Sequence, residues 1–200
     1  YYVSSGHARA RSYIDFSIVS RDGFVVITGE VGSGKTLLLR KLLQEVHGQT
    51  PVVHIEQTQL TPLEFLQTVW LGLGGKSRVD SKVDLLQLIR EYVEKLHDEG
   101  KQVVIAVDEA QGLSIDVLED IRMLSGIESH KDKLLSFVLT GQPELDRVID
   151  HPAMEQLRQR VRLRFRLQGL SMAETWTYIQ LRLAIAGADE PEKVIDDSCC

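Results

Sequence analysis

Residues 23–43 read GFVVITGEVGSGKTLLLRKLL and contain the stretch that decides the fold. The apolar, β-branched residues 23–28 predict a buried strand, and residues 37–43 predict a helix. Between them, residues 29–36 (GEVGSGKT) fit the pattern G-x-x-x-x-G-K-[ST] at every fixed position. A strand, a glycine-rich loop and a helix in this order predict a phosphate-binding loop.

The residue types in this loop suit a nucleotide. Glycines let the backbone turn tightly and direct successive N–H groups at phosphate oxygens, and the following helix adds the positive end of its dipole. We expect Lys35 to contact the β- and γ-phosphates and Thr36 to ligate Mg²⁺. The predicted nucleotide-binding residues are Gly29, Glu30, Val31, Gly32, Ser33, Gly34, Lys35, Thr36 and Leu37. The alternative is a glycine-rich turn that holds no ligand.

A second signal is the apolar stretch at residues 102–109, which ends in Asp108 and Glu109. In open parallel sheets, ligands bind outside the carboxyl ends of the strands, where the glycine loop also lies. We therefore expect Asp108 to hold Mg²⁺ opposite Thr36. Glu109 is placed to polarise the attacking water, as a general base or by orientation. A carboxylate pair that only caps a helix is the alternative.

Further polar residues are candidates for sensing or covering the nucleotide. Thr140 and Gln142 end a predicted strand at residues 134–140, and either could hydrogen-bond the attacking water or the γ-phosphate. Gln142 is favoured because it is the first polar side chain beyond a small glycine, and an ordinary turn residue is the alternative. Near the start of the chain, Tyr2 or His7 could stack on the base, although we favour exposed helix residues there.

Arginines alternate with apolar residues late in the chain. The arginines are Arg158, Arg160, Arg162, Arg164 and Arg166, and the apolar residues are Val161, Leu163, Phe165 and Leu167. This period of two predicts a fifth strand at about residues 160–167 with one arginine face, and we interpret the arginines at 162, 164 and 166 as a solvated face. An arginine at the start of the strand could act on a neighbouring subunit's nucleotide, where such groups raise the rate by ~10³ to 10⁵. A phosphate-backbone patch for DNA needs the same arginines.

The remaining elements alternate between strand and helix. A second strand is predicted at 51–56, and helices at 8–18, 61–73, 85–96, from 114 onward and at 171–185. Capping boxes, Thr61 with Glu64 and Ser171 with Glu174, mark the start of two of these helices. Continuous apolar strands indicate a parallel sheet covered by helices on both faces. The sequence thus predicts an α/β fold.

Composition narrows the class of protein. Among 200 residues, 43% are hydrophobic and 26% charged, as in an ordinary globular protein, and the formal net charge of −6 does not favour a general nucleic-acid-binding protein. No apolar stretch approaches the ~18 residues that span a bilayer. Cys199 and Cys200 fit neither a disulfide framework nor a zinc site, which indicates a reducing compartment. Because the chain starts at Tyr1, we expect it to be a piece of a longer protein.

Five stretches carry a family resemblance. They are GEVGSGKT (29–36), VVIAVDEAQGLS (103–114), IRMLSGIE (121–128), LTGQPEL (139–145) and MEQLRQRVRLRFRLQGLSMAET (154–175). In this order they resemble the AAA+ ATPases of the general secretion pathway protein A (ExeA-like) type, over about residues 1–187. The resemblance implies a P-loop NTPase fold with a parallel five-stranded sheet of order 5-1-4-3-2. It also implies a nucleotide-binding core at residues 1–168 and the beginning of a helical lid at 169–200, with a sensor 2 arginine beyond the end of this chain.

The same resemblance implies site roles and cofactors. Residues 29–36 match Walker A, Asp108 and Glu109 match Walker B, and sensor 1 falls near Gln142. Arg160 best matches the arginine-finger position, with Arg158 as the alternative. ATP and Mg²⁺ are the implied cofactors.

The implied function is Mg²⁺-dependent ATP binding and hydrolysis that drives or switches the assembly of a bacterial secretion, pilus or polysaccharide-export system. Implied partners are further copies in a ring and inner-membrane secretion or export components, with peptidoglycan only through domains outside this chain. The implied location is the cytoplasmic face of the inner membrane. One alternative is a DNA-binding, ATP-dependent switch resembling transposition helper ATPases. Another is a module that holds ATP and barely hydrolyses it.

Overall fold

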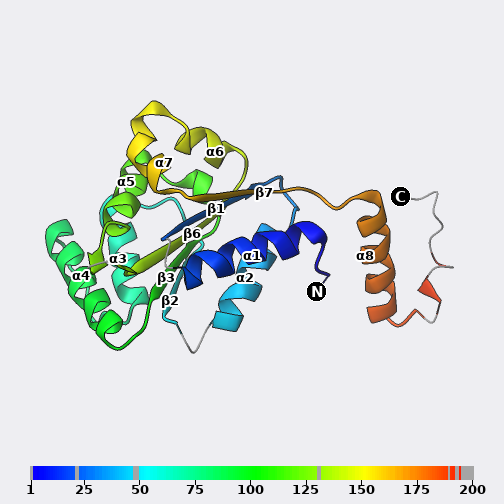
Figure 1. The fold of residues 1–200 in the computed structure, drawn as a ribbon, viewed down its shortest axis with the longest axis horizontal. Coiled ribbons are helices and arrows are strands. Elements are labelled where there is room, and N and C mark those ends of the chain that lie inside the picture. Colours follow the sequence, from blue (N-terminus) through cyan, green and yellow to red (C-terminus); the bar gives the residue numbers. More distant parts are fainter. Residues whose placement is uncertain are drawn as a thin grey trace.

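The computed structural model describes residues 2–20, 23–46, 50–129, 132–188, 190, 191 and 194. A parallel five-stranded sheet in the order β2-β3-β6-β1-β7 runs through its centre (Figure 1). The strands are β1 (Phe24–Gly29), β2 (Val52–Ile55), β3 (Val103–Val107), β6 (Leu135–Gly141) and β7 (Leu163–Leu167). Counted from the β7 edge in chain order, these strands read 5-1-4-3-2, which confirms the predicted topology.

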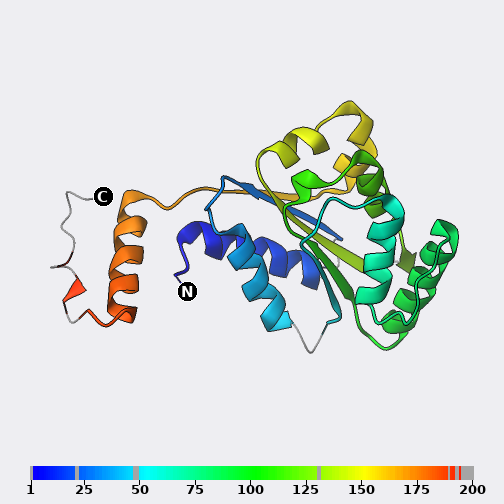
Figure 2. The same cartoon turned by 180° about the vertical axis from the view of Figure 1, so that it is seen from behind.

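Helices cover both faces of the sheet, and Figure 2 shows the arrangement from behind. On one face, α1 (Ser5–Val19) and α2 (Lys35–Val46) pack over side chains such as Val25 and Ile27. On the other face, α3 (Pro62–Gly72), α4 (Lys82–Asp98) and α5 (Ile115–Leu124) pack over side chains such as Phe24 and Val26. Alternate residues of β1 thus point into two separate cores, as in any strand that is buried on both faces.

The predicted capping boxes are present. Thr61 and Glu64 cap α3 reciprocally, with Pro62 as the first helical residue. Ser171 and Glu174 do the same for α8 (Met172–Ile185). Each pair satisfies backbone N–H groups that a helix cannot bond internally at its first turn.

Helix α8 lies apart from the sheet in Figure 1, and none of its residues is buried. It meets the start of the chain, where the Glu174 carboxylate accepts hydrogen bonds from the backbone N–H and the hydroxyl of Ser5, each at 2.9 Å. Together with the N–H of Ser171, these donors lower the pKa of Glu174 to about 2. The division of the chain into a core and a lid after residue 168 stays a prediction.

The predicted fifth strand needs a correction. Strand β7 begins at Leu163 rather than at residue 160, and Arg158 and Arg160 lie on the short helix α7 (Glu155–Arg160). Leu157 and Val161 both pack against the core, and their spacing of four residues places them on one face of a helix. The alternation that predicts a strand therefore applies only from Leu163 onward.

Several short elements have no counterpart in the sequence prediction. They are η1 (Ala110–Gly112), the hairpin β4 (Glu128–Ser129) and β5 (Asp132–Lys133), α6 (Glu144–Ile149) and η2 (Pro152–Met154). Across the residues that the structure describes, no helix combines the length and hydropathy needed to cross a bilayer. Cys199 and Cys200 lie outside the described residues.

Candidate active site

The predicted site residues lie at the carboxyl edge of the sheet, around the end of its central strand. Strand β6 lies between β1 and β3. Thr28 pairs in register with Gly141, and Val107 pairs with Leu139. The loop after β1, the carboxylates after β3 and the residues after β6 therefore emerge side by side, as expected for a ligand site of an open parallel sheet.

Backbone geometry explains the glycines of the loop. Gly32 and Gly34 have φ values of 80° and 90°, in the left-handed region that glycine adopts without strain. A Cβ atom on Gly34 would lie 2.5 Å from Nε2 of His7, and one on Gly29 would lie 2.5 Å from the carbonyl oxygen of Leu167. The loop is thus held against α1 at Gly34 and against β7 at Gly29, with no space for a side chain at these two glycines.

Lys35 begins α2, and its side chain lies inside the loop. The residue is only 5% exposed, and its Nζ donates to the carbonyl oxygens of Gly29 at 2.8 Å and Glu30 at 2.9 Å. The buried hydroxyl of Ser33 has no hydrogen-bond partner among the described residues. These groups are donors that fit a phosphate group: the buried ammonium of Lys35, the unsatisfied hydroxyl of Ser33 and the N–H groups at the start of α2. Thr36 follows as the second residue of α2 and is partly buried.

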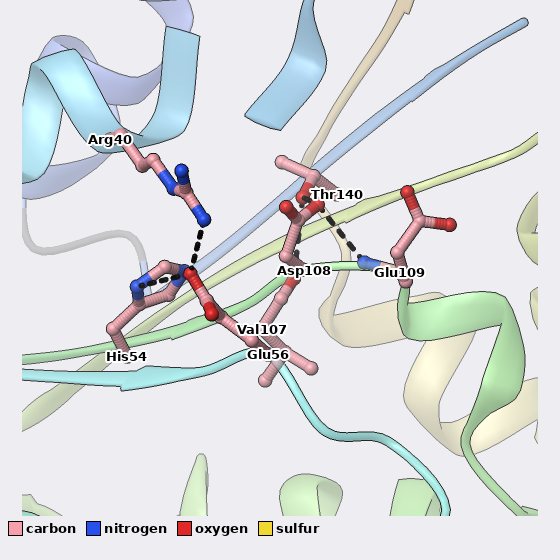
Figure 3. Close-up of polar contacts among 7 residues, drawn as sticks. All are labelled: Arg40, His54, Glu56, Val107, Asp108, Glu109 and Thr140. Atoms are coloured by element: carbon pink, nitrogen blue, oxygen red, sulfur yellow. Dashed lines mark hydrogen bonds and ion pairs between the residues drawn. The ribbon is translucent and has the colours of Figure 1, made fainter. Parts of the chain in front are cut away.

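Asp108 and Thr140 form a buried pair at the ends of β3 and β6 (Figure 3). Asp108 is 4% exposed and Thr140 is fully buried. The Thr140 hydroxyl donates to Oδ1 of Asp108 at 2.5 Å, and the N–H of Glu109 donates to the same oxygen at 3.0 Å. Thr140, a candidate sensor of the nucleotide, thus contacts the predicted metal ligand.

The oxygen atoms near the loop suit Mg²⁺ that takes some of its ligands from water and phosphate. Within the part of the chain that the structure describes, they do not form a site in which protein side chains supply every ligand. The described residues contain no group of three or more His, Cys, Asp and Glu side chains that could hold a metal ion. One buried carboxylate and a threonine hydroxyl are oxygen ligands, which Mg²⁺ prefers, and Mg²⁺ usually takes its other ligands from water and phosphate. Asp108 and Thr36 therefore fit Mg²⁺ bound together with a nucleotide.

Glu109 points away from the Asp108–Thr140 pair in Figure 3. Its carboxylate oxygen Oε2 accepts from the side-chain amide of Gln111 at 2.5 Å and from that of Gln142 at 3.4 Å. Gln142, predicted to contact the water or the γ-phosphate, is thus brought next to the predicted general base. Gln111 has no role in the sequence prediction, because no spacing rule marks a glutamine two residues after a glutamate.

A neighbouring ion pair is exposed and does not belong to this site. Arg40 on α2 lies 2.9 Å from the carboxylate of Glu56, with His54 at 3.7 Å from the same oxygen (Figure 3). The side chains of Arg40 and Glu56 are 56% and 57% exposed. Pairs this exposed contribute little to stability, and this pair only connects α2 to the end of β2.

A cavity of about 270 Å³ lies between the glycine loop and α8. Its lining includes Tyr2, His7, Gly34, Leu37, Tyr178 and Leu181. The expectation of an exposed helix residue is wrong for His7, which is 6% exposed, because its ring packs on the glycine loop and its Nδ1 lies 2.6 Å from the hydroxyl of Ser4. Burial lowers the pKa of His7, while a hydrogen bond with the backbone of Ser33 opposes this shift. The imidazole is therefore neutral at pH 7.

Arg160 lies at the opposite, amino edge of the sheet. It lines a second cavity, of about 540 Å³, together with Gly23, Arg122, Lys133 and Arg162. The length of β1 separates this edge from the glycine loop by roughly 17 Å, at about 3.3 Å per residue. The structure therefore does not bring Arg160 to the Lys35 and Glu109 of its own chain.

The other arginines of the predicted row have separate surroundings. Arg158 lies 3.7 Å from Glu155 on its own helix. On β7, Arg164 forms an ion pair with Asp150 at 2.7 Å, and Arg166 forms one with Glu30 of the glycine loop at 3.3 Å. Arg166 is solvated, with 63% of its side chain exposed, whereas Arg164 is only 29% exposed. The arginine row is thus divided between the helix α7 and the strand β7.

Comparison with known proteins identifies a protein family that matches this chain and one similar protein. The model of the family described as "AAA domain" matches residues 18–149. The chain is similar to "General secretion pathway protein A" of Aeromonas hydrophila, with 37% identity over 191 residues. This match covers 95% of the present chain and 35% of the relative, so the chain spans about a third of the relative's length. The predicted resemblance is confirmed.

Solved structures with the same fold include two archaeal proteins. The ORC2 protein of Aeropyrum pernix, in ADPNP–ADP complexes, has a TM-score of 0.65 and 19% identity, over 90% of this chain and 50% of that one. Cdc6p from Pyrobaculum aerophilum has a TM-score of 0.71 and 18% identity, over 92% of this chain and 52% of that one. At these identities the likeness concerns the fold, and it confirms the predicted AAA+ type of P-loop fold.

Proposed function

This chain belongs to the AAA domain family, and on that premise we propose that it binds ATP with Mg²⁺ and hydrolyses it. The observation that carries the proposal is the grouping at one sheet edge of a loop with a buried lysine, a buried aspartate and an adjacent glutamate. Lys35 supplies positive charge to the β- and γ-phosphates, and the loop N–H groups bind phosphate oxygens.

The remaining residues serve the hydrolysis step. Asp108 and Thr36 hold Mg²⁺, which neutralises phosphate charge when bound. Glu109 orients the attacking water and accepts its proton. Gln142 contacts the Glu109 carboxylate, so it links the end of β6 to the base. Tyr2 and Leu37 line the cavity beside the loop, which suits the base of the nucleotide.

The site is completed by a second copy of the chain. Arg160 lies at the sheet edge opposite to its own glycine loop. It lines a cavity together with other positively charged side chains. A head-to-tail arrangement brings the arginine edge of one copy to the nucleotide edge of the next, and such contacts generate rings when they close. Arg160 then stabilises the charge that develops on the transferred phosphoryl group.

The name of the Aeromonas hydrophila relative refers to a secretion pathway, and we propose that this chain serves a process of the same kind. The proposed output is ATP-driven assembly or switching of a bacterial secretion, pilus or polysaccharide-export system. The proposed partners are inner-membrane components of that system, and the proposed location is the cytoplasmic face of that membrane. For this chain itself we propose no contact with peptidoglycan. The 37% identity to the secretion protein over nearly this entire chain supports the extension.

The first test is ATP turnover per subunit across a series of protein concentrations. We expect turnover to rise with concentration, because Arg160 comes from a neighbour. Glu109→Gln should retain nucleotide affinity and lose turnover, whereas Lys35→Ala should lose nucleotide affinity itself. Unchanged affinity in Lys35→Ala, or unchanged turnover in Glu109→Gln, would refute the assigned roles.

The second test concerns action between subunits. Arg160→Ala should bind nucleotide and fail to hydrolyse it. Mixing this variant with Glu109→Gln should restore turnover, because some interfaces then combine the intact Glu109 of one subunit with the intact Arg160 of its neighbour. Arg158→Ala, treated in the same way, tests the alternative finger, because Arg158 lies two residues away on the same helix. Absence of rescue in the mixture would contradict action in trans.

A further inference from the structure

We propose that Gln111 is a positioning residue for Glu109 that ties the carboxylate of the general base to the end of β6. This proposal rests on the proposed ATPase function and deepens it. The side-chain oxygen of Gln111 accepts from the backbone N–H of Gln142 at 2.9 Å, and its nitrogen donates to Oε2 of Glu109 at 2.5 Å. A backbone N–H can only donate, so the amide must present its oxygen to Gln142 and its nitrogen to Glu109.

The backbone of Glu109 is held at both of its polar groups. Its N–H donates to Asp108, and its carbonyl accepts from the N–H of Gly112 at 2.9 Å. Its φ of 51° is the only positive value at a non-glycine residue among those described. A non-glycine residue keeps this sparsely populated conformation only where its surroundings determine it, and such residues cluster at functional sites.

The side chain of Glu109 is then oriented by two amides. Gln111 and Gln142 both contact Oε2, which restricts rotation of the carboxylate about its last bond. Because Gln142 also donates its backbone N–H to Gln111, any movement at the end of β6 displaces both donors together. The orientation of the base is therefore coupled to the end of β6, the strand between β1 and β3.

The surrounding residues leave space for this amide. A Cβ atom on Gly141 would lie 2.7 Å from the side-chain oxygen of Gln111, so a larger residue there would displace the amide. On either side of Gln111 and Gly112, Ala110 and Leu113 are 1% and 6% exposed and anchor the turn in the core. Gln111 itself is only partly buried, as a residue that faces a substrate site should be.

The experiment compares Gln111→Met with wild type under saturating and limiting ATP. Methionine keeps the length of the side chain and removes both hydrogen bonds. We expect kcat to fall at least tenfold, with the KM and the Kd for ATP unchanged within twofold. Gln87→Met is the matched control, because Gln87 donates to the carboxylate of Glu91 at 2.8 Å on the exposed face of α4. Equal losses in kcat and affinity, or an unchanged kcat, would overturn the proposal.

A double variant tests whether Gln111 acts through Glu109. In a Glu109→Ala background, Gln111→Met should change the residual rate by less than twofold, whereas a further loss of tenfold would show that Gln111 acts independently. The contact itself is measured without turnover, by the side-chain amide ¹H–¹⁵N resonances of Gln111. These should shift in Glu109→Ala, and unshifted resonances would overturn the contact. Lack of turnover in wild type at every concentration would count against the proposed function alone.

Discussion

At the scale of single residues, the site depends on two charges that the fold removes from water. Asp108 and Lys35 are 4% and 5% exposed. A buried charge is costly unless it is hydrogen-bonded. The aspartate has the Thr140 hydroxyl as donor, and the lysine has two loop carbonyls as acceptors. The contacts that hold these side chains in place for a nucleotide therefore also stabilise the folded protein.

Thr140→Val tests this double role. Valine keeps the shape of threonine and removes the donor to a buried carboxylate. We expect the free energy of unfolding to fall by about 1.5–3 kcal/mol, as for other hydrogen bonds to charged groups. Urea unfolding measures it, and Thr140→Ser is the control that keeps the hydroxyl. A valine variant as stable as the serine variant would contradict the argument.

At the scale of elements, an ion pair between a buried carboxylate and a partly exposed lysine connects two helices of the same face. The side chain of Asp120 on α5 is completely buried, and Lys82 at the first position of α4 contacts it at 2.5 Å. Burial raises the pKa of the Asp120 carboxyl, and the hydrogen bond from Lys82 opposes that shift. The lysine therefore makes a charged carboxylate tolerable at this buried position of α5.

Lys82→Met should make the stability of the protein strongly dependent on pH. A carboxyl whose pKa is higher in the folded protein binds more protons when folded. The stability that this carboxyl contributes to the folded protein is fully present below pH 3.8, its ordinary pKa. That stability is lost as the pH rises through the pKa of the folded protein. We expect the variant to approach wild type near pH 4 and to be less stable at pH 7, by at most about 4 kcal/mol, because one proton changes the free energy of unfolding by about 1.4 kcal/mol per pH unit.

Urea unfolding at several pH values measures this loss. Lys101→Met is the control, because Lys101 and its partner Glu99 are 47% and 44% exposed. Exposed pairs of this kind contribute roughly 0–1 kcal/mol. A loss in Lys82→Met that is the same at pH 4 and pH 7 would show that Asp120 stays protonated or finds water instead.

At the scale of the whole molecule, the two ends of the sheet carry different groups. The carboxyl edge has the glycine loop, Asp108 and Glu109, whereas Arg160 lies at the amino edge. A molecule with complementary edges suits assembly with its own copies in a head-to-tail manner. The start of the chain and α8 also meet near the loop, through Ser5 and Glu174.

The distribution of arginines also bears on binding to DNA. The arginine row is divided between α7 and β7, and the ion pairs of Arg164 with Asp150 and of Arg166 with Glu30 leave less positive charge for a DNA backbone. We expect no binding of a labelled DNA duplex at ~50 mM salt, where binding through basic patches is strongest. Fluorescence anisotropy measures it, and affinity that falls steeply as salt increases would contradict the expectation.

The sequence by itself determined the elements whose signals are local. The glycine loop, its flanking strand and helix, and the capping boxes at Thr61 and Ser171 depend on residues a few positions apart. The parallel sheet follows from apolar strands that alternate with helices. These features are encoded by hydrogen bonding and periodicity within one segment, so they can be read without knowing what lies across the sheet.

Only the tertiary structure decided which polar groups meet. Thr140 lies 32 positions from Asp108, and Gln142 lies 31 positions from Gln111, so each contact depends on the register between β6 and β3. The same holds for Arg160, because core packing of its neighbours gives a helix where alternation predicts a strand. Contacts between distant segments arise from the packing of complete elements, and no short stretch of sequence contains that information.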